Sequence, residues 1–336
     1  MSDSFPTILH SGILGEILHD YLPRLIERGF KPLHERVPLT SEELMDLAPK
    51  AMVVFGPGRG LDANFFEAAR NLKVVSLVSS GWDAVHVESA TRCGVPVVVA
   101  PAQMAESVAD LTWGLMLCTA RQIPQRYWLL RTHQTADTKL GNLVYGKTLG
   151  IIGMGFIGKA VVRRAAGFNM RILGYDSDGF WDKDFADTHS TKRVGLDELL
   201  QQSDIVSIHL RPTAKTIGVI GARELQLMKP SAILINTSRA NLVDGTALYH
   251  ALVEGHLAGL GTDVDTDNGL DAPILSLPNV VCTPHIGGRS LETAYELVEQ
   301  AAGNALMVLE GKRPEMLVNP EVYGSEKRAQ KQRQRA

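Results

Sequence analysis

Short apolar runs alternate with amphipathic stretches along most of this 336-residue chain. Four runs before residue 100 have the continuous apolar character of buried parallel strands, at 7–10, 51–55, 73–78 and 96–99. Three stretches between them have helical character, at 12–28, 62–70 and 85–93. This alternation predicts an α/β domain at the start of the chain.

A second series of predicted strands begins near residue 147. Its apolar runs lie at 149–152, 171–175, 205–210, 232–236, 259–263 and 280–283. Between the two series we expect a long apolar helix over 105–121, followed by a polar loop over 122–146. A last helix is expected over 290–309, where the chain returns to the first domain.

The run at 149–152 leads directly into a G-x-G-x-x-G motif whose glycines are Gly153, Gly155 and Gly158. In a strand–turn–helix unit the first glycine permits the turn, the second admits a pyrophosphate, and the third lets helix and strand pack closely. Alone, the motif also fits a glycine turn that binds no ligand. Asp176 strengthens the dinucleotide interpretation, because it follows the motif at close to the roughly 20-residue spacing of a ribose-binding carboxylate. That carboxylate favours NAD over NADP.

The composition is that of an ordinary globular protein, with 45% apolar and 21% charged residues and a net charge of −3. It gives no case for nucleic-acid or membrane partners. Three widely spaced cysteines favour buried thiols in a reducing compartment over disulfides, and no metal site is predicted. We expect a cytoplasmic protein, because the chain shows no signal peptide and no apolar run of the ~18–20 residues that span a bilayer. The basic residues 322–336 are expected to form a disordered tail.

Polar side chains follow the later predicted strands at the points where each strand ends. They include His209, the segment 236–239, Asp263 and His285. Open α/β sheets bind ligands at the carboxyl ends of their strands, so this clustering predicts a site there.

Five motifs identify a family. They lie at 105–110, 146–150, 206–213, 235–239 and 283–288, and in combination and order the chain closely resembles the D-isomer-specific 2-hydroxyacid dehydrogenases over roughly residues 50–318. The resemblance implies a doubly wound parallel-sheet Rossmann domain that binds NAD (NADH), inserted in a second, flavodoxin-like α/β substrate domain. The expected boundaries are 1–102 and 288–321 for the substrate domain and 103–287 for the NAD-binding domain. It also implies a catalytic cleft between the domains and a homodimer built largely through the NAD-binding domain.

The resemblance implies, by motif position, that Arg239 binds the 2-keto acid and that His285 exchanges the proton on its oxygen as hydride moves. A planar guanidinium suits the adjacent carboxylate and carbonyl, and imidazole titrates near neutrality. The glutamate that usually pairs with the histidine is replaced by Asn268, an amide that cannot raise a pKa by charge. Asp265 or Asp267 supplies the carboxylate instead, or His285 works without an acidic partner.

The glycine motif, Asp176 and the resemblance, which includes a match to the family's substrate loop at 78–83, give the remaining predicted site residues. The predicted cofactor-binding set is Gly153, Gly155, Phe156, Ile157, Gly158, Asp176, His209, Leu210, Thr216, Thr237, Ser238, Arg239, Asp263, His285 and Gly287. The predicted substrate-binding set is Ser79, Ser80, Gly81, Trp82 and Arg239, because a Ser-Ser-Gly turn can present N–H groups to a carboxylate.

The leading prediction is therefore an NAD-dependent oxidoreductase that interconverts a small D-2-hydroxy acid and its 2-keto acid. Two alternatives remain open because of Asn268. One is an NAD-sensing interaction protein resembling the C-terminal-binding corepressors, and the other is an oxidation that needs no proton transfer at a carbonyl oxygen. The motifs specify neither the acid nor the physiological direction.

Overall fold

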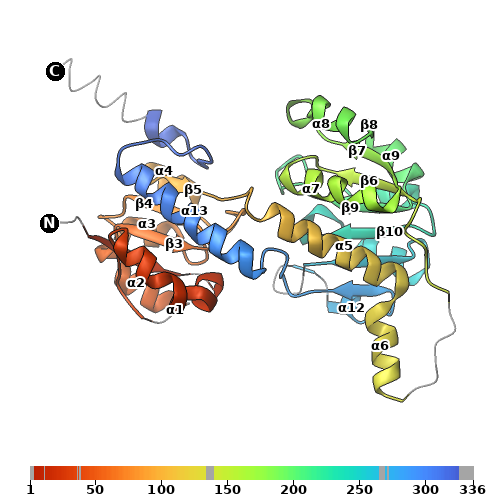
Figure 1. Ribbon diagram of the computed structural model, residues 1–336, viewed down its shortest axis with the longest axis horizontal. Helices are drawn as coiled ribbons and strands as arrows, with labels where there is room; N and C mark the ends of the chain where they lie inside the picture. The colour runs from red at the N-terminus through yellow and green to blue at the C-terminus, as the bar shows by residue number, and fades with distance from the viewer. Residues whose placement is uncertain are drawn as a thin grey trace. The chain divides into compact units, whose positions relative to one another are not determined.

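The computed structural model describes residues 4–10, 12–35, 37, 39–133, 140–264, 269–270 and 272–324. Its internal contacts divide the chain into two compact units. Unit 1 comprises Met1–Met104 and Arg289–Ala336, and unit 2 comprises Ala105–Gly288. Each unit is an α/β structure built on its own parallel sheet (Figure 1).

Unit 1 has a five-stranded parallel sheet in the order β2-β1-β3-β4-β5. Its strands are β1 (Phe5–Leu9), β2 (Phe30–Pro32), β3 (Val53–Gly56), β4 (Val74–Leu77) and β5 (Val97–Val98). Its helices are α1 (Gly12–Glu27), α2 (Ser41–Leu47), α3 (Ala63–Ala68), α4 (Val87–Arg92) and α13 (Leu291–Leu309), with a short η1 (Ala48–Lys50). This strand order is flavodoxin-like, as predicted.

Alternate strand residues of unit 1 point to opposite faces of the sheet, and both faces are covered. In β3, Val53 and Phe55 pack with α1 and α13, whereas Val54 packs in the cluster that contains residues of α2, α3 and α4. Helix α13 begins at its N-cap Ser290, and the Ser76 hydroxyl of β4 donates to the Ala301 carbonyl. The last long helix therefore packs against the sheet formed by the start of the chain.

Unit 2 has a seven-stranded, wholly parallel sheet in the order β12-β11-β10-β9-β6-β7-β8. Its strands are β6 (Thr148–Ile152), β7 (Arg171–Tyr175), β8 (Thr191–Arg193), β9 (Ile205–Ile208), β10 (Ile233–Asn236), β11 (Gly259–Thr262) and β12 (Val280–Cys282). Reversal of the strand order at β6 gives the doubly wound topology of a dinucleotide-binding sheet.

Helices cover both faces of this second sheet. They are α5 (Ala105–Arg121), α6 (Ile123–Arg131), α7 (Phe156–Ala165), α8 (Lys183–Thr188), α9 (Leu196–Gln202), α10 (Ala222–Leu227), α11 (Gly245–Val253) and α12 (Ala272–Leu275), with short η2 (Ala166–Phe168), η3 (Asp178–Phe180) and η4 (Ala240–Leu242). Ile151 packs with α5 and α7, whereas Ile152 packs on the opposite face with α9, α10 and α11. The continuous apolar pattern of the strands follows from this burial on two sides.

The prediction of a loop over 122–146 is wrong for its first part, because residues 123–131 form α6. Gln122 adopts a left-handed backbone (φ 52°) that separates α6 from α5, and Pro124 lies in the first turn. No side chain of α6 is buried. The helix therefore lacks the periodic apolar face by which helices are recognised in a sequence. Figure 1 shows α6 extending away from the sheet of its unit.

Three other expectations concern the surface and the chain end. The cysteines are free, but Cys93 is exposed and Cys118 and Cys282 are half-buried, so the expectation of full burial is wrong. Val322, placed at the start of the predicted tail, is buried, and residues 325–336 lie outside the described part of the chain.

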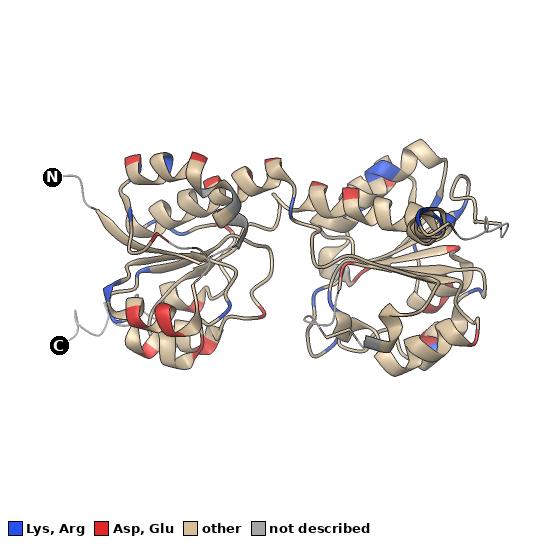
Figure 2. Ribbon diagram, turned by 90° about the horizontal axis from the view of Figure 1, so that it is seen from below, with Lys and Arg blue, Asp and Glu red and all other residues tan. Residues whose placement is uncertain are grey.

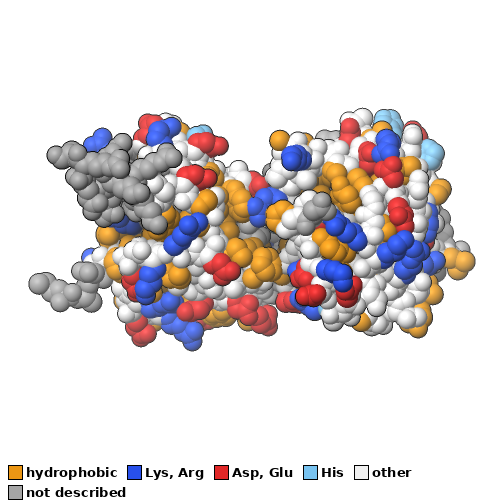
Figure 3. Space-filling view, turned by 90° about the horizontal axis from the view of Figure 1, so that it is seen from above, with side chains coloured by type: hydrophobic (Ala, Val, Ile, Leu, Met, Phe, Trp, Pro, Cys, Tyr) orange, Lys and Arg blue, Asp and Glu red, His pale blue; other side chains and the backbone are white. Residues whose placement is uncertain are grey.

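Within the described residues, no helix has the length and apolar character needed to cross a bilayer. Acidic and basic side chains are interspersed on the faces of each unit seen in Figures 2 and 3.

Candidate functional site

The glycine turn between β6 and α7 shows a different requirement at each glycine. Gly153 has a left-handed backbone (φ +100°), and a Cβ there would lie 2.7 Å from the His209 carbonyl group. A Cβ on Gly158 would lie 2.0 Å from the Gly153 carbonyl oxygen. Gly155 has no heavy atom within 4 Å of where its Cβ would be. The chain's own packing therefore requires the first and third glycines, whereas the second borders open space into which a ligand can approach.

The N-terminus of α7 begins at this open space. Its N-cap is Gly155, which offers no side chain to accept from the first backbone N–H groups of the helix. These N–H groups and the positive end of the helix dipole suit a phosphate. Phe156 and Ile157, in the first turn, are at least partly exposed.

Asp176 lies directly beside the glycine turn. Its carboxylate accepts a hydrogen bond from the Met154 backbone N–H (2.7 Å) and another from the Ser177 N–H (2.7 Å). These bonds fix the carboxylate at the end of β7, next to the strand that enters the glycine turn. A carboxylate has about four lone-pair positions, so two bonds leave it able to accept from ribose hydroxyls.

His209, at the end of β9, carries a buried nitrogen. Its Nε2 lies 2.9 Å from the Ser207 hydroxyl, and its Nδ1 is buried with no hydrogen-bond partner within the described ranges. Desolvation lowers the pKa of this histidine to about 3, so the ring is neutral at physiological pH. A buried polar atom without a partner, beside the glycine turn, fits a site completed by a polar ligand.

The loops after β9 and β10 are joined by hydrogen bonds. The Ser238 hydroxyl donates to the Leu210 carbonyl, and the Thr216 hydroxyl donates to the Arg211 carbonyl (2.6 Å). Thr216 also accepts from the Thr213 N–H at 2.8 Å. The predicted residues Leu210, Thr216 and Ser238 therefore shape the loops at the carboxyl end of the sheet.

The segment that carries Arg239 is fixed by Asn236, the last residue of β10. The Asn236 amide donates to the Arg239 carbonyl (2.9 Å) and accepts from the Ser238 N–H (3.0 Å). The Arg239 guanidinium donates to the Ser238 carbonyl at 2.9 Å. Thr237 adds a contact to α5, because its hydroxyl lies 3.1 Å from that of Thr112. Four consecutive residues are thereby held at the strand end.

The loop that carries His285 is organised by Asp263, which follows β11 and is 4% exposed. One carboxylate oxygen accepts from the Thr283 hydroxyl (2.6 Å) and the Ile286 N–H (2.8 Å), and the other accepts from the Gly287 N–H (2.7 Å). His285 itself is exposed and has a left-handed backbone (φ 52°). Non-glycine residues rarely adopt that conformation, so the bonds to Asp263 compensate local strain at this histidine.

Helix α5 holds both loops. The Ser107 hydroxyl donates to the Gly287 carbonyl at 2.7 Å, and Thr112 contacts Thr237 as described above. The sequence placed Asn236 in the polar cluster at the strand ends and Ser107 in a family motif, but it predicted a positioning role for neither. Thr112 was not singled out, and its signal is a polar residue in a largely apolar helix.

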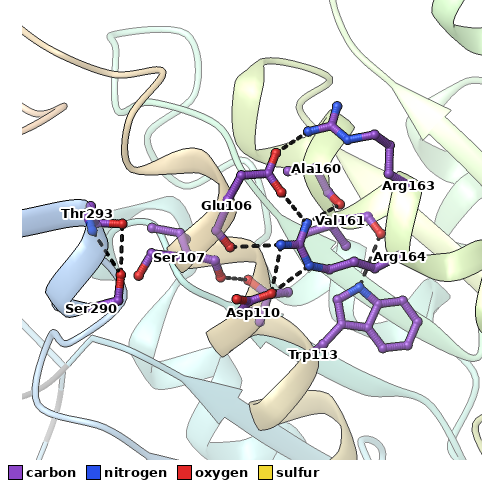
Figure 4. Close-up of polar contacts among 12 residues, drawn as sticks. Glu106, Ser107, Asp110, Trp113, Ala160, Val161, Arg163, Arg164, Ser290 and Thr293 are labelled. Carbon is purple, nitrogen blue, oxygen red and sulfur yellow. Dashed lines mark hydrogen bonds and ion pairs between the residues drawn. The ribbon is translucent and has the colours of Figure 1, made fainter. Parts of the chain in front are cut away.

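The same helix is tied to α7 by ion pairs (Figure 4). Glu106 pairs with Arg163 and Arg164, and Arg164 also pairs with Asp110 at 2.7 Å. Burial raises the pKa of Glu106, but the hydrogen bonds from the two arginines outweigh that effect and lower it. The Trp113 indole N–H donates to the Val161 carbonyl of α7 at 3.1 Å. The helix bearing Ser107 and Thr112 is thus fastened to the helix that follows the glycine turn.

The predicted substrate residues lie in unit 1, after β4. The Ser79 hydroxyl donates to the Gly81 carbonyl (2.9 Å), and the Ser80 N–H points to the Met104 sulfur (3.2 Å). Trp82 is partly buried and packs against the core of its unit. The predicted site residue Asn268 and its possible substitutes Asp265 and Asp267 lie outside the described residues.

The strand order and the glycine turn define a Rossmann-type dinucleotide-binding unit. Residues 113–287 match the model of the D-isomer specific 2-hydroxyacid dehydrogenase, NAD binding domain. The chain belongs to this family, and it is an NAD-dependent dehydrogenase that acts on a CH–OH group. Within the described residues, no cluster of three or more His, Cys, Asp or Glu could hold a metal ion.

Named relatives support this membership. The chain is 42% identical over 271 residues to a glyoxylate reductase of Korarchaeum cryptofilum, with 78% of this chain and 80% of that protein covered. It is 38% identical over 285 residues to a D-3-phosphoglycerate dehydrogenase of Methanocaldococcus jannaschii, with 84% of this chain and 54% of that protein covered. A crystal structure of a glyoxylate reductase from Paecilomyes thermophila superposes with a TM-score of 0.80 at 27% identity, covering 96% of this chain and 99% of the other.

Proposed function

We propose that this enzyme interconverts a small D-2-hydroxy acid and its 2-keto acid, with Arg239 binding the substrate and His285 exchanging the proton. The observation that carries the proposal is the arrangement of three neighbouring strand ends. Arg239 follows β10, Asp263 follows β11 and His285 lies beyond β12, and Asp263 binds the loop that bears the histidine. An anion-binding cation and an exposed imidazole thus come from the same edge of one sheet.

The chemistry assigned to each residue follows from its charge. The Arg239 guanidinium binds the carboxylate and the adjacent carbonyl of a 2-keto acid through charge-assisted hydrogen bonds. In the reductive direction NADH supplies a hydride to the carbonyl carbon. His285 donates a proton to the oxygen on which negative charge develops, and it accepts that proton in the oxidative direction.

The remaining predicted residues take cofactor and substrate roles in this proposal. Gly153, Gly155 and Gly158, with the first turn of α7 at Phe156 and Ile157, hold the pyrophosphate. Asp176 accepts from the ribose hydroxyls. The residues His209, Leu210, Thr216, Thr237, Ser238, Asp263 and Gly287 shape the rest of the cofactor site, and Ser79, Ser80, Gly81 and Trp82 contribute to substrate binding.

Glyoxylate is the first substrate to test, because several relatives are named glyoxylate reductases. The experiment follows NADH oxidation with glyoxylate, hydroxypyruvate, pyruvate and bulkier keto acids. We expect turnover of at least one small acid, and a loss of about 100-fold or more in kcat for His285→Gln. Turnover that survives unchanged in both His285→Gln and Arg239→Gln would overturn the assignment.

Substitution of Asn268 tests the proton-transfer step assigned to His285. A glutamate at position 268 would favour the protonated form of His285 by its charge, which the amide of asparagine does not do. Asn268→Glu is expected to extend the pH profile of kcat/KM upward, and coincident profiles would contradict this. Tight NADH binding with no keto-acid turnover would instead favour the NAD-sensing interaction protein, or an oxidation without carbonyl protonation.

We also propose a homodimer. The apolar side chains of α6 support it, because Tyr127, Trp128 and Leu130 are 57%, 65% and 76% exposed, respectively. Sedimentation of the purified protein at micromolar concentration is expected to give the mass of two chains. The double variant Trp128→Glu/Leu130→Glu is expected to sediment as one chain, and an unchanged mass would exclude this helix from the interface.

A further inference from the structure

A second charged side chain lies beside Asp176, and it comes from the neighbouring strand. Strand β8 pairs with β7 in parallel, with Arg193 opposite Gly174. Asp176 is two residues beyond Gly174, so Asp176 and Arg193 belong to the same face of the sheet. That is the face covered by α7, since Ile172 of the same row packs with α7 residues.

Two of the contacts of Arg193 show where its guanidinium lies. Its guanidinium donates to the Asp176 backbone carbonyl at 3.1 Å. Its Cζ also lies 5.2 Å from the centre of the Trp181 ring. The indole in turn packs directly on β7, where a Cβ on Gly174 would be 2.9 Å from the ring. The absence of a side chain at Gly174 therefore makes room for the aromatic surface on which Arg193 lies.

The pairing matters because the 2′ position of the adenosine ribose distinguishes NAD from NADP. A carboxylate that accepts from the 2′-hydroxyl repels a 2′-phosphate, whereas a guanidinium binds a phosphate through a fork of donors. We propose that Arg193 sets how strongly this enzyme discriminates NAD from NADP. Asp176 gives the preference for NAD, and Arg193 limits it by attracting the additional phosphate. This inference rests on the proposed ribose role of Asp176.

The sequence alone indicates no cation near Asp176, since no arginine follows it within residues 177–179. The cation is supplied 17 positions later and is brought back by the pairing of β7 with β8. A sequence motif confined to the end of one strand does not record it.

The test measures dissociation constants of NADH and NADPH by nucleotide fluorescence, with the full-length protein and no substrate. Asp176→Asn removes the repulsion and keeps Arg193, and it is expected to tighten NADPH binding about tenfold. Arg193→Gln is expected to weaken NADPH binding about tenfold and to change NADH binding less than about threefold. In the double variant the gain from Asp176→Asn is expected to be mostly lost.

The matched control is Lys192→Gln. Lys192 is the adjacent cation on β8, but it points to the other face of the sheet, where its Nζ is 2.8 Å from Glu198. The Lys192→Gln substitution removes the same charge at nearly the same position along β8. A general electrostatic effect would therefore lower NADPH affinity equally in Lys192→Gln and Arg193→Gln. Such equality, or an NADPH/NADH ratio unchanged by Arg193→Gln, would overturn the proposal. A wild-type protein that binds neither nucleotide would instead contradict the cofactor site itself.

Discussion

The two ends of the proposed active site are built in different ways. At the dinucleotide end, the requirements fall on backbone geometry within one short segment, where Gly153 and Gly158 have no room for a side chain. At the catalytic end, the loop that bears His285 depends on side chains from other elements, namely Asp263 and Ser107. A backbone requirement restricts the residue type at its own position. A supporting hydrogen bond instead depends on a residue far away in the sequence.

The largest expected effect separates the two kinds of glycine at the dinucleotide end. Gly158→Ala places a Cβ against the Gly153 carbonyl and is expected to lower the free energy of unfolding by more than about 3 kcal/mol. Gly155→Ala faces open space, so it is expected to leave stability within about 1 kcal/mol of wild type and to weaken NADH binding about tenfold. Urea unfolding and fluorescence titration measure the two quantities. Equal losses of stability in both variants would contradict the distinction.

The next effect concerns the catalytic end. Asp263→Ala leaves the Ile286 and Gly287 N–H groups and the Thr283 hydroxyl without their buried acceptor. We expect a loss of stability of about 3 kcal/mol and a fall in kcat of roughly 100-fold, because the loop no longer holds His285. Asp263→Asn, which retains one acceptor oxygen, is expected to lose less. If NADH affinity falls as much as kcat in both variants, Asp263 acts mainly on the cofactor.

His209 provides a pH-dependent comparison. Its folded pKa of about 3 lies below the ordinary value of 6.5, so below pH 6.5 the unfolded chain binds a proton that the folded protein does not. Stability from this residue is therefore present above pH 6.5 and is lost as the pH falls, by up to about 1.4 kcal/mol per pH unit.

Urea unfolding between pH 7 and pH 5 tests this dependence. His209→Asn is expected to flatten the profile relative to wild type, and His250→Gln, which changes an exposed histidine, is the control. A wild-type slope retained in His209→Asn would show that other groups carry the dependence.

These regions also differ in how far the sequence predicts them. The fold class and the glycine turn were predictable, because continuous apolar runs and G-x-G-x-x-G are local patterns. Helix α6 was not, since none of its side chains is buried and it leaves no apolar periodicity. The contacts of Ser107 and Thr112 with loops 125 or more positions away follow from the packing of α5 on the sheet, and no local pattern encodes them. The roles of Arg239, His285 and Asn268 remain predictions.

The smallest expected effect isolates the support that α5 gives to the His285 loop. Ser107→Ala removes one hydrogen bond to the Gly287 carbonyl, worth about 1 kcal/mol, and is expected to lower kcat about threefold without changing NADH affinity.

Thr119→Val on the same helix is the matched control. The Thr119 hydroxyl is buried and has no hydrogen-bond partner within the described residues, so its removal is expected to change stability by less than about 0.5 kcal/mol, or to increase it. If Ser107→Ala lowered stability and left kcat unchanged, the contact would stabilise the fold without positioning the histidine. A fall in kcat with NADH affinity preserved would place the function of this hydrogen bond at the catalytic end alone.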